Sequence, residues 1–390
     1  MNETNRQPDW DPESEEVQRD QRNAYDMMRE RCSVAYSDAR GWSVFRHTDV
    51  TRILHDLDTF SNAVSVHVAV PNGMDPPMHT AYRRIVDRYF TPDRVAAFEP
   101  QCRAIAADIV GNAITKGNED IDWIVNVAKP FATRVQCAFL GWPSHIQERI
   151  SQWIAKRHAS TSNRNRQAII SVAKEFECFI DEIIETASHA GTPPKTDVIS
   201  DLLDQRIDGR PLNGREISSI LRNFTVGEIG TIAASVGILA HYLAAHATVQ
   251  ERCRTEPVVL AAAIDEILRI DGPLATNRRV TTCPVSIGDK QIGPKERVSI
   301  NWIAANRDWR SIEEPDRVRF DRTPGQNLLY GAGIHACPGA PLARLELRVF
   351  VEELLARTTW IRLSPSIPAS RAKYPETGFA SLSLQIEKVQ

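Results

Sequence analysis

Residues 330–344 read YGAGIHACPGAPLAR, and this stretch decides how the rest of the chain is interpreted. Gly331 and Gly333 precede Cys337, and glycine permits the positive φ angles and close backbone approach of a tight loop. The Pro-Gly pair after the cysteine indicates the entry to a helix. A helix N-terminus favours a thiolate, because the helix dipole and free N–H groups stabilise negative charge. The stretch therefore predicts an activated cysteine at the start of a helix.

The local pattern alone leaves three roles open for this cysteine. It is a buried structural cysteine, or half of a zinc site with His335, or a thiolate ligand of iron whose potential is tuned by N–H to sulfur hydrogen bonds. The seven cysteines are spread along the chain and include no CxxC pair. This spacing disfavours both a zinc ribbon and a disulfide framework.

The composition is that of an ordinary globular protein. Of the 390 residues, 42% are hydrophobic and 25% are charged, and the net charge of −3 comes from interspersed acidic and basic side chains. Without a basic stripe for a phosphate backbone, we expect no nucleic-acid partner. The N-terminal segment has no signal or transit pattern, and the longest apolar run, 232–240, is about half of a ~20-residue membrane span. We expect a cytoplasmic protein with no membrane partner.

Hydrophobic periodicity predicts a mainly α fold with a small β region. Helical spacing dominates from residue 93 to residue 246 and returns in an amphipathic helix at 340–355. Alternation of apolar and polar residues at 280–303 predicts short strands. No internal repeat or biased linker interrupts the chain, so we expect a single domain over 1–390, with 1–13 as a flexible N-terminal arm.

The run GAGIHACPG at residues 331–339 resembles the haem-binding signature of the cytochrome P-450 family, and the residues that follow are similar to soluble bacterial members. The resemblance implies that Cys337 is the axial thiolate ligand of haem b, with Gly331 and Gly339 in the cofactor loop. It also implies the family's fold, a triangular and mainly helical prism around the haem. One departure is Tyr330, where the family usually has phenylalanine.

Glu266-Ile267-Leu268-Arg269 matches the family's ExxR motif. On a helix, the i,i+3 spacing places the carboxylate and the guanidinium on one face. An isolated pair of this kind is more often a surface ion pair of little energetic value. The resemblance implies instead a buried pair joined by an arginine from the irregular meander, and Arg317 fits that place. We expect these three side chains to support the thiolate loop.

The segment DPPMHTAYRR at residues 75–84 resembles the family's segment that opens the helix crossing the haem. His79 and Arg83 lie at i,i+4 and can reach one anion, which the resemblance identifies as a haem propionate. Arg279 matches the third cationic contact, with the adjacent Arg278 as the alternative, and His335 completes the site. Without the resemblance, His79 would be a helix cap and Arg83 a solvated side chain.

The predicted helix 215–246 contains the family's oxygen-activating segment in altered form. Its interior glycines each cost about 1 kcal/mol relative to alanine, so either close helix packing or a flat cofactor requires them. In the family an acid directly precedes a threonine, and the two deliver protons to reduced dioxygen. Thr231 matches the threonine, but Gly230 replaces the acid and Glu228 stands where glycine is usual. We expect Glu228 to supply protons by a shifted route; binding a polar substrate group or assisting hydrogen peroxide are the alternatives.

The resemblance also implies where a substrate binds: an apolar loop, the long helix, the stretch after the ExxR helix and the C-terminal turn. The expected pocket residues are Val66, Val68, Phe224, Gly227, Leu274, Ala275, Thr276 and Phe379. Such a lining predicts an apolar substrate. A loose likeness to O-dealkylating members of the family favours a small aromatic one.

Together these matches imply a haem-thiolate monooxygenase that hydroxylates or O-dealkylates such a substrate with dioxygen. Electrons would come from NAD(P)H through a separate ferredoxin or flavodoxin and its reductase. The alternative among enzymes is a peroxygenase that uses hydrogen peroxide. The alternative outside enzymes is a haem-thiolate sensor that binds a ligand without turnover.

Overall fold

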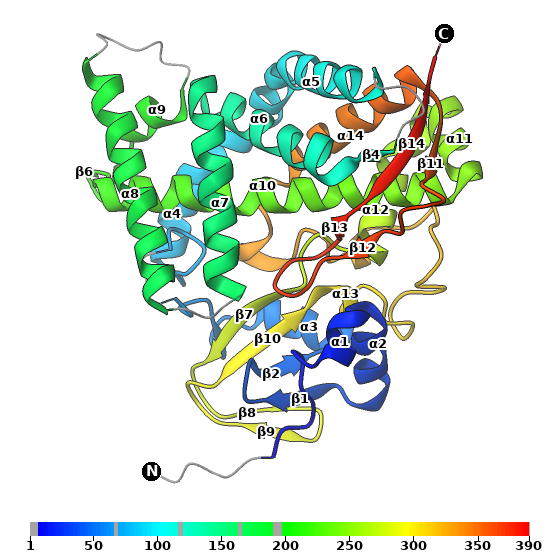
Figure 1. Cartoon of the computed structure of the whole chain (residues 1–390). Coiled ribbons are helices and arrows are strands. Elements are labelled where there is room, and N and C mark those ends of the chain that lie inside the picture. The colour runs from blue at the N-terminus through cyan, green and yellow to red at the C-terminus, as the bar shows by residue number, and fades with distance from the viewer. Residues whose placement is uncertain (1–6, 66–68, 116–119, 163–165, 190–196, 390) are drawn as a thin grey trace. The chain divides into compact units, whose positions relative to one another are not determined.

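The computed structural model describes residues 7–65, 69–115, 120–162, 166–189 and 197–389. The chain divides into two compact units, each assembled from segments that are far apart in sequence. Unit 1 comprises Met1–Val64, Val258–Cys337 and Ser370–Ala380, and unit 2 comprises Ser65–Pro257, Pro338–Ala369 and Ser381–Gln390. Figure 1 labels their helices and strands.

Unit 1 is built around a five-stranded sheet in the order β1-β2-β10-β7-β3 (Figure 1). The β2–β10 pair is parallel and the other pairs are antiparallel. Gly41 in the β1–β2 connection has φ of +72°, and a Cβ there would lie 2.6 Å from the carbonyl oxygen of Arg297, so only glycine fits this turn. Val44 and Ile300 of the sheet share one hydrophobic core with Ile53 of α3.

The elements of unit 1 are α1 (Glu15–Arg19), α2 (Gln21–Arg31), β1 (Val34–Ser37), β2 (Gly41–Val44), α3 (His47–His55), β3 (Phe60–Ser61), α12 (Leu260–Ile270), β7 (Thr276–Thr281), β8 (Val285–Ile287), β9 (Lys290–Ile292), β10 (Arg297–Asn301), α13 (Trp302–Ala305), β12 (Ser370–Arg371) and β13 (Phe379–Ser381). Strands β8 and β9 form a hairpin, and β12 pairs with β13. Short 3₁₀ turns, η5 (Pro324–Gln326) and η6 (Gly333–His335), interrupt the irregular stretch before the cysteine.

Unit 2 is helical, with α10 as its longest helix (Figure 1). Its elements are α4 (Met78–Asp87), η1 (Arg88–Phe90), α5 (Pro92–Ile114), β4 (Ile121–Asp122), η2 (Ile124–Ala128), α6 (Lys129–Leu140), η3 (Ser144–Ile146), α7 (Gln147–Ser162), α8 (Arg166–His189), α9 (Val198–Asp204), β5 (Arg206–Ile207), β6 (Arg210–Pro211), α10 (Gly214–Ala245), α11 (Ala247–Thr255), α14 (Ala340–Arg357), β11 (Thr358–Leu363) and β14 (Ser383–Lys388). A further turn, η4 (Pro257–Val259), lies at the boundary with unit 1.

The N-terminus of α10 is fixed by a capping box. The Asn213 side chain accepts the Glu216 N–H at 3.0 Å, and the Glu216 carboxylate accepts the Asn213 N–H at 2.8 Å. Tyr82 of α4 donates to the same carboxylate, and Arg210 pairs with it at 2.7 Å. These contacts fix where the helix begins, and thereby the turns in which Gly227, Glu228 and Thr231 lie.

The prediction of a mainly α fold with a small β region is confirmed. The helix expected at 340–355 forms as α14, and the alternation at 280–303 forms the end of β7 together with β8, β9 and β10. Two separate helices, α1 and α2, lie between residues 15 and 31, because Asp20 caps the second with its carboxylate on the Asn23 N–H. The single domain stays a prediction, since contacts divide the chain into two units.

Helix α10 is long and apolar enough to pass a length-and-composition test for a membrane span. Of the tested window, 56% is buried inside the structure. A core helix of a water-soluble protein passes the same test, so α10 is weak evidence for a membrane span.

Candidate functional site

A backbone hydrogen bond and a glycine with positive φ define the conformation of the loop that ends at Cys337. The Cys337 N–H donates to the carbonyl oxygen of Tyr330 at 2.8 Å, closing the turn. Gly333 has φ of +70°, and a Cβ there would lie 2.6 Å from the carbonyl oxygen of Leu54 on α3. Cys337 is exposed, and Ala340 three residues later is the first residue of α14. The loop therefore places Cys337 in an exposed position, just before the helix that the sequence predicts there.

The chemistry of Cys337 fits iron held in a macrocycle. Among the described residues, no group of three or more His, Cys, Asp or Glu side chains is arranged to hold a metal ion. A zinc site would need such a group, since structural zinc takes four protein ligands and catalytic zinc takes three. Haem needs only one protein donor on a face, because the porphyrin supplies the other four. Within the described part of the chain, no third His, Cys, Asp or Glu side chain joins Cys337 and His335 in such a group.

Glu266 and Arg269 form a buried ion pair on α12. Arg269 Nε lies 2.7 Å from Glu266 Oε1, and its Nη1 donates to the carbonyl oxygens of Asn306 and Pro315 at 2.7 and 2.8 Å. Arg322 Nε reaches Glu266 Oε2 at 2.7 Å. Burial raises the pKa of Glu266, but the bonds from Arg269 and Arg322 outweigh burial and hold the pKa below its usual value.

The third member of this cluster is Arg322, so the prediction of Arg317 is wrong. The Arg317 side chain is 71% exposed and pairs with Glu314 at 3.2 Å, not with Glu266. Its backbone carbonyl accepts from Arg269 at 3.4 Å and from Arg322 at 3.2 Å. The irregular segment contains arginines at 317, 319 and 322. Because the segment has no regular period, the sequence does not indicate which of these side chains points toward Glu266.

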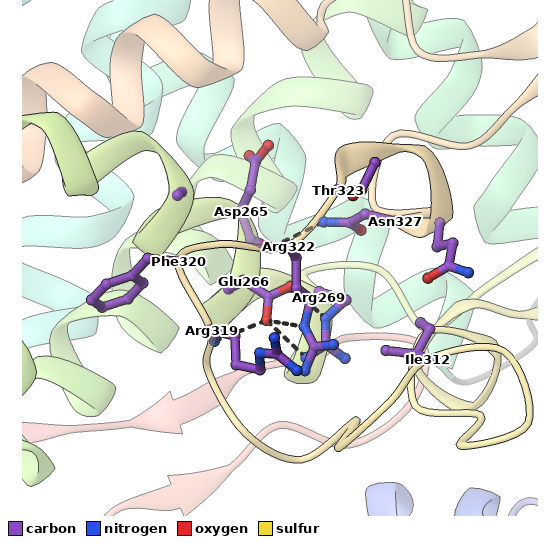
Figure 2. Close-up of a pocket in the computed structure, with 11 residues that line it drawn as sticks. Asp265, Glu266, Arg269, Ile312, Arg319, Phe320, Arg322, Thr323 and Asn327 are labelled. Atoms are coloured by element: carbon purple, nitrogen blue, oxygen red, sulfur yellow. Dashed lines mark hydrogen bonds and ion pairs between the residues drawn. The ribbon is translucent and has the colours of Figure 1, made fainter.

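A pocket in unit 1 lies against this cluster. Figure 2 shows Glu266 in contact with Arg269 of its own helix and with Arg322 of the irregular segment. The pocket is lined by Ala262, Asp265, Glu266, Arg269, Ile312, Arg319, Phe320, Arg322, Thr323, Gln326 and Asn327. Because Glu266, Arg269 and Arg322 are already bound to one another, we interpret the pocket as part of the support for the cysteine loop.

The four residues predicted to bind a haem propionate lie on α4, β7 and η6. His79 and Arg83 lie one turn apart on α4, where His79 is buried and Arg83 pairs with Asp87 at 2.6 Å. Burial, followed by the nearby charge of Arg83, lowers the pKa of His79. Arg279 is buried on β7 and donates to the Arg278 carbonyl at 2.8 Å. His335 lies in η6, in unit 1. Their joint action on one anion stays a prediction.

The glycines of α10 separate into two kinds. A Cβ on Gly237 would lie 2.8 Å from Ile124 Cδ1, so close packing explains that glycine. A Cβ on Gly227 or Gly230 would meet no atom within 4 Å, and Gly227 is exposed. These two positions leave open space along one turn of α10. Close helix packing therefore does not explain these two glycines, and a flat cofactor against the backbone stays a prediction.

Thr231 lies in the same turn. Its hydroxyl donates to the carbonyl oxygen of Gly227 at 2.6 Å and contacts that of Glu228 at 3.1 Å. The Glu228 side chain reaches two other helices. With its amide nitrogen turned toward the carboxylate, Gln136 of α6 donates to both Glu228 oxygens, 2.6 Å from Oε1. The other neighbour is the carboxyl group of Glu346 on α14.

Glu346 and Gln136 are site residues that sequence reasoning missed. Both are fully buried. Burial raises the pKa of Glu228, and burial together with the charge of Glu228 raises the pKa of Glu346. The sequence did contain one signal: Glu346 lies between Leu345 and Leu347, where a charged residue in a buried helix needs a reason.

The predicted substrate residues are partly described. Val66 and Val68 lie outside the described residues. Phe224 packs edge-to-face against Tyr89 and Phe90, with ring centroids 5.8 and 5.2 Å away. The remaining positions are Leu274, exposed; Ala275, buried; Thr276, within 3.5 Å of the Tyr374 hydroxyl; and Phe379, buried beneath the Arg371 guanidinium.

Comparisons with known proteins agree with this geometry. The family model described as Cytochrome P450 matches residues 138–373. A probable cytochrome P450 127A1 from Sinorhizobium fredii is 31% identical over 335 residues, covering 84% of this chain and 79% of the relative. The cyclomarin C epoxidase CymV from Salinispora arenicola is 29% identical over 342 residues, covering 83% of this chain and 85% of the relative.

Solved structures give the same answer. Cytochrome P450 CYP109Q5 from Chondromyces apiculatus has a TM-score of 0.86 at 27% identity, covering 97% of this chain and 98% of that one. CYP109E1 from Bacillus megaterium, in complex with corticosterone, has a TM-score of 0.84 at 26% identity, covering 95% and 99%. With Cys337 in the signature loop and Glu266 and Arg269 joined as the family requires, the chain belongs to the cytochrome P450 family and is a haem-thiolate monooxygenase.

Proposed function

We propose that this monooxygenase inserts one oxygen atom of dioxygen into a small, apolar and preferably aromatic substrate, by hydroxylation or O-dealkylation. The observation that carries the oxygen chemistry is the exposed Cys337 at the end of the signature loop. Within unit 2, the open space along α10 at Gly227 and Gly230 also supports it. The aromatic preference is supported by Phe224, which stands in an edge-to-face cluster with Tyr89.

Our assignment of the haem contacts follows the donor chemistry of these residues. Cys337 would hold the iron through its sulfur. His79, Arg83, Arg279 and His335 would hold the two propionates, because charge-assisted hydrogen bonds to carboxylates are strong. Bound haem supplies the redox chemistry of dioxygen, and the protein supplies binding, orientation and protons.

Proton supply is the step in which this chain departs from its relatives' usual pattern. Hydroxylation of one C–H bond consumes one dioxygen, two electrons and two protons, and releases one water. We assign Thr231 to hold the final proton donor and Glu228 to supply protons, since Gly230 has no side chain to do so. Exchange of Glu228 for glutamine should lower the product formed per NAD(P)H several-fold, and unchanged coupling would refute this assignment.

We propose that electrons come from NAD(P)H through a ferredoxin or flavodoxin and its reductase, in the cytoplasm. Arg344, one turn into α14, is our candidate contact for an acidic partner. Arg348 on the same helix is the second candidate, and Glu99 and Glu352 bind it at 2.7 and 2.9 Å. Reversal of either charge, in Arg344→Glu or in Arg348→Glu, should slow reduction by the partner and weaken the salt dependence of its rate. Normal reduction kinetics in one of these variants would rule out a part for that residue.

A spin-state titration tests the substrate class. The ferric enzyme is titrated with methoxyarenes, terpenes and fatty acids. It is also titrated with two larger compounds: erythromycin, after the similar erythromycin C-12 hydroxylase of Saccharopolyspora erythraea, and corticosterone, after the CYP109E1 complex. A saturable low-to-high-spin shift with methoxyarenes alone supports the small aromatic class. A shift only with macrolides or steroids would refute it and assign the enzyme a larger substrate.

A peroxide-driven reaction is the second candidate, and one observation favours it. No acid directly precedes Thr231 in the sequence, and the Thr231 hydroxyl donates a hydrogen bond to the Gly227 carbonyl oxygen. Turnover supported by hydrogen peroxide alone, at a rate equal to that with the electron-transfer partners, would establish this route. Peroxide turnover that is negligible beside reductive turnover would exclude it.

A further inference from the structure

We propose that Ser219 and Asn223 of α10 are positioning residues that hold the chain at Val70 as one wall of the substrate site, and that this wall limits the size of the substrate. The inference deepens the proposed function and rests on it, because it takes the open space along α10 as the place where the substrate lies. The two side chains together with Val70 are called the Val70 clamp.

Both backbone polar groups of Val70 are bound by side chains of one helix. The Val70 N–H donates to Ser219 Oγ at 2.9 Å, and Asn223 Nδ2 donates to the Val70 carbonyl oxygen at 2.8 Å. Val70 is fully buried, and Ser219 is 2% exposed. A buried N–H that loses its acceptor costs more than an ordinary hydrogen bond contributes, because no water replaces the acceptor. The two bonds therefore fix the position of Val70 relative to α10.

The chain that contains Val70 is also attached to α10 further along. The Gly73 N–H donates to the Ala69 carbonyl oxygen at 2.7 Å, so a backbone hydrogen bond closes the turn around Val70. Helix α4 follows this turn, and Tyr82 of α4 donates to Glu216 of α10. Figure 1 shows α4 beside α10. The clamp therefore positions a closed turn that leads into a helix already docked on α10.

The residues that bind this chain lie on the same face of α10 as the open space. Glu216, Ser219 and Asn223 are separated by three and four residues, which is the spacing of one helical face. Gly227 and Gly230 continue this spacing, and a Cβ on either would meet no atom within 4 Å. Asn223 precedes Gly227 by one turn. The clamp is therefore at the end of the open space that lies toward the N-terminus of α10.

A wall held at this place sets how far a ligand can extend along α10. A ligand longer than the open turn has to displace the chain at Val70, and this displacement breaks both hydrogen bonds of the clamp. The cost falls on long ligands and leaves short ones unaffected. Because specificity is a difference between two affinities, a cost of this kind selects for small substrates.

The chain offers a matched control one residue away. Ser218 is 2% exposed, like Ser219, but its hydroxyl has no hydrogen-bond partner within the described part of the chain. Ser218→Ala therefore removes the same group at the same depth without touching Val70. Asn223→Asp is the second test variant, because it keeps the volume of the side chain and replaces the donor to the Val70 carbonyl with an acceptor.

Hydrogen exchange of the holoenzyme, resolved to the Val70 amide, tests the clamp itself. Exchange at Val70 should be at least fivefold faster in Ser219→Ala and in Asn223→Asp than in the wild type, because each variant removes one of the two bonds. Ser218→Ala should exchange at the wild-type rate. Equal exchange at Val70 in the wild type and in Ser219→Ala would overturn the clamp.

Azole binding to the ferric holoenzyme tests the size limit without turnover. The probes are imidazole, phenylimidazole and biphenylimidazole, which bind iron through a ring nitrogen and shift the Soret band. In the wild type, biphenylimidazole should bind at least tenfold more weakly than phenylimidazole. This ratio should fall at least threefold in Ser219→Ala and in Asn223→Asp and stay the same in Ser218→Ala. The Kd of imidazole, which is too short to reach the wall, should change less than twofold in every variant.

Two results of the azole titrations would contradict the size limit. One is a ratio that is unchanged in both Ser219→Ala and Asn223→Asp although exchange at Val70 is faster, since the clamp would then be structural only. The other is a wild type that binds both substituted imidazoles equally well. Failure of the proposed function is seen separately, as a wild type that gives no product with any electron donor, and it leaves these binding ratios unchanged.

Discussion

Removal of Arg322 should destabilise unit 1 far more than removal of Arg317. In Arg322→Ala the buried carboxylate of Glu266 loses an ion pair of 2.7 Å and keeps its pair with Arg269. The same change removes the Arg322 bonds to the carbonyl oxygens of Glu313 and Glu314, at 2.6 and 2.8 Å. In Arg317→Ala only an exposed pair is lost.

The magnitude follows from burial. Breaking a buried ion pair by removing one partner costs about 3–5 kcal/mol, and because Glu266 keeps Arg269 we take the lower end, about 3 kcal/mol. The exposed Arg317–Glu314 pair is worth about 1 kcal/mol or less. Urea unfolding of the haem-free chain, followed by circular dichroism, should therefore show a midpoint lower by roughly 1 M for Arg322→Ala and a nearly unchanged one for Arg317→Ala.

Haem retention supplies a second measurement. If the cluster supports the cysteine loop, Arg322→Ala should lose haem faster than wild type, and Arg317→Ala should not. Equal destabilisation by both variants, or a loss below 1 kcal/mol for Arg322→Ala, would refute the assignment of Arg322 to the cluster.

Three further predictions concern the site. Because the pKa of Glu346 is raised in the folded chain, the folded state holds a proton that the unfolded state releases above pH ~4.3. The free energy of unfolding should therefore fall by up to about 1.4 kcal/mol per pH unit above that value. Urea titrations at several pH values should show a flatter slope for Glu346→Gln, and a slope equal to that of the wild type would contradict the prediction. Gly227→Leu should weaken haem binding at least tenfold in a haem titration while leaving helical content intact, and normal affinity would show that the open space is not used. Cys337→Ala should abolish the thiolate signature in the spectrum of the reduced carbon monoxide complex, and its persistence would exclude Cys337 as the ligand.

Much of the fold was predictable because it depends on local pattern. The helical period placed α10 and α14 within a few residues of their ends, and the alternation over 280–303 placed β8, β9 and β10. The two-unit division was not predictable, since each unit joins segments that are distant in sequence. Contacts of this kind leave no periodic signal along the chain.

The same distinction applies to the site. Cys337, Glu266 and Arg269 were found because their partners lie within a few residues, on a loop or a helix whose geometry spacing fixes. Arg322 was missed because the meander has no period to orient its arginines. Glu346 was missed because its partner is on another helix, more than one hundred residues away in sequence. Only packing reveals such a pair.

Oxygen-18 labelling tests the central claim most directly. A substrate that gives a spin-state shift and is hydroxylated at carbon is incubated with the holoenzyme, an electron-transfer system and labelled dioxygen in unlabelled water. The hydroxylated product, whose oxygen does not exchange with water, is analysed by mass spectrometry. The account predicts one labelled oxygen atom per turnover in the wild type and no such product from Cys337→Ala. Unlabelled product oxygen, or equal product from Cys337→Ala, would contradict a monooxygenase that works through the Cys337 thiolate.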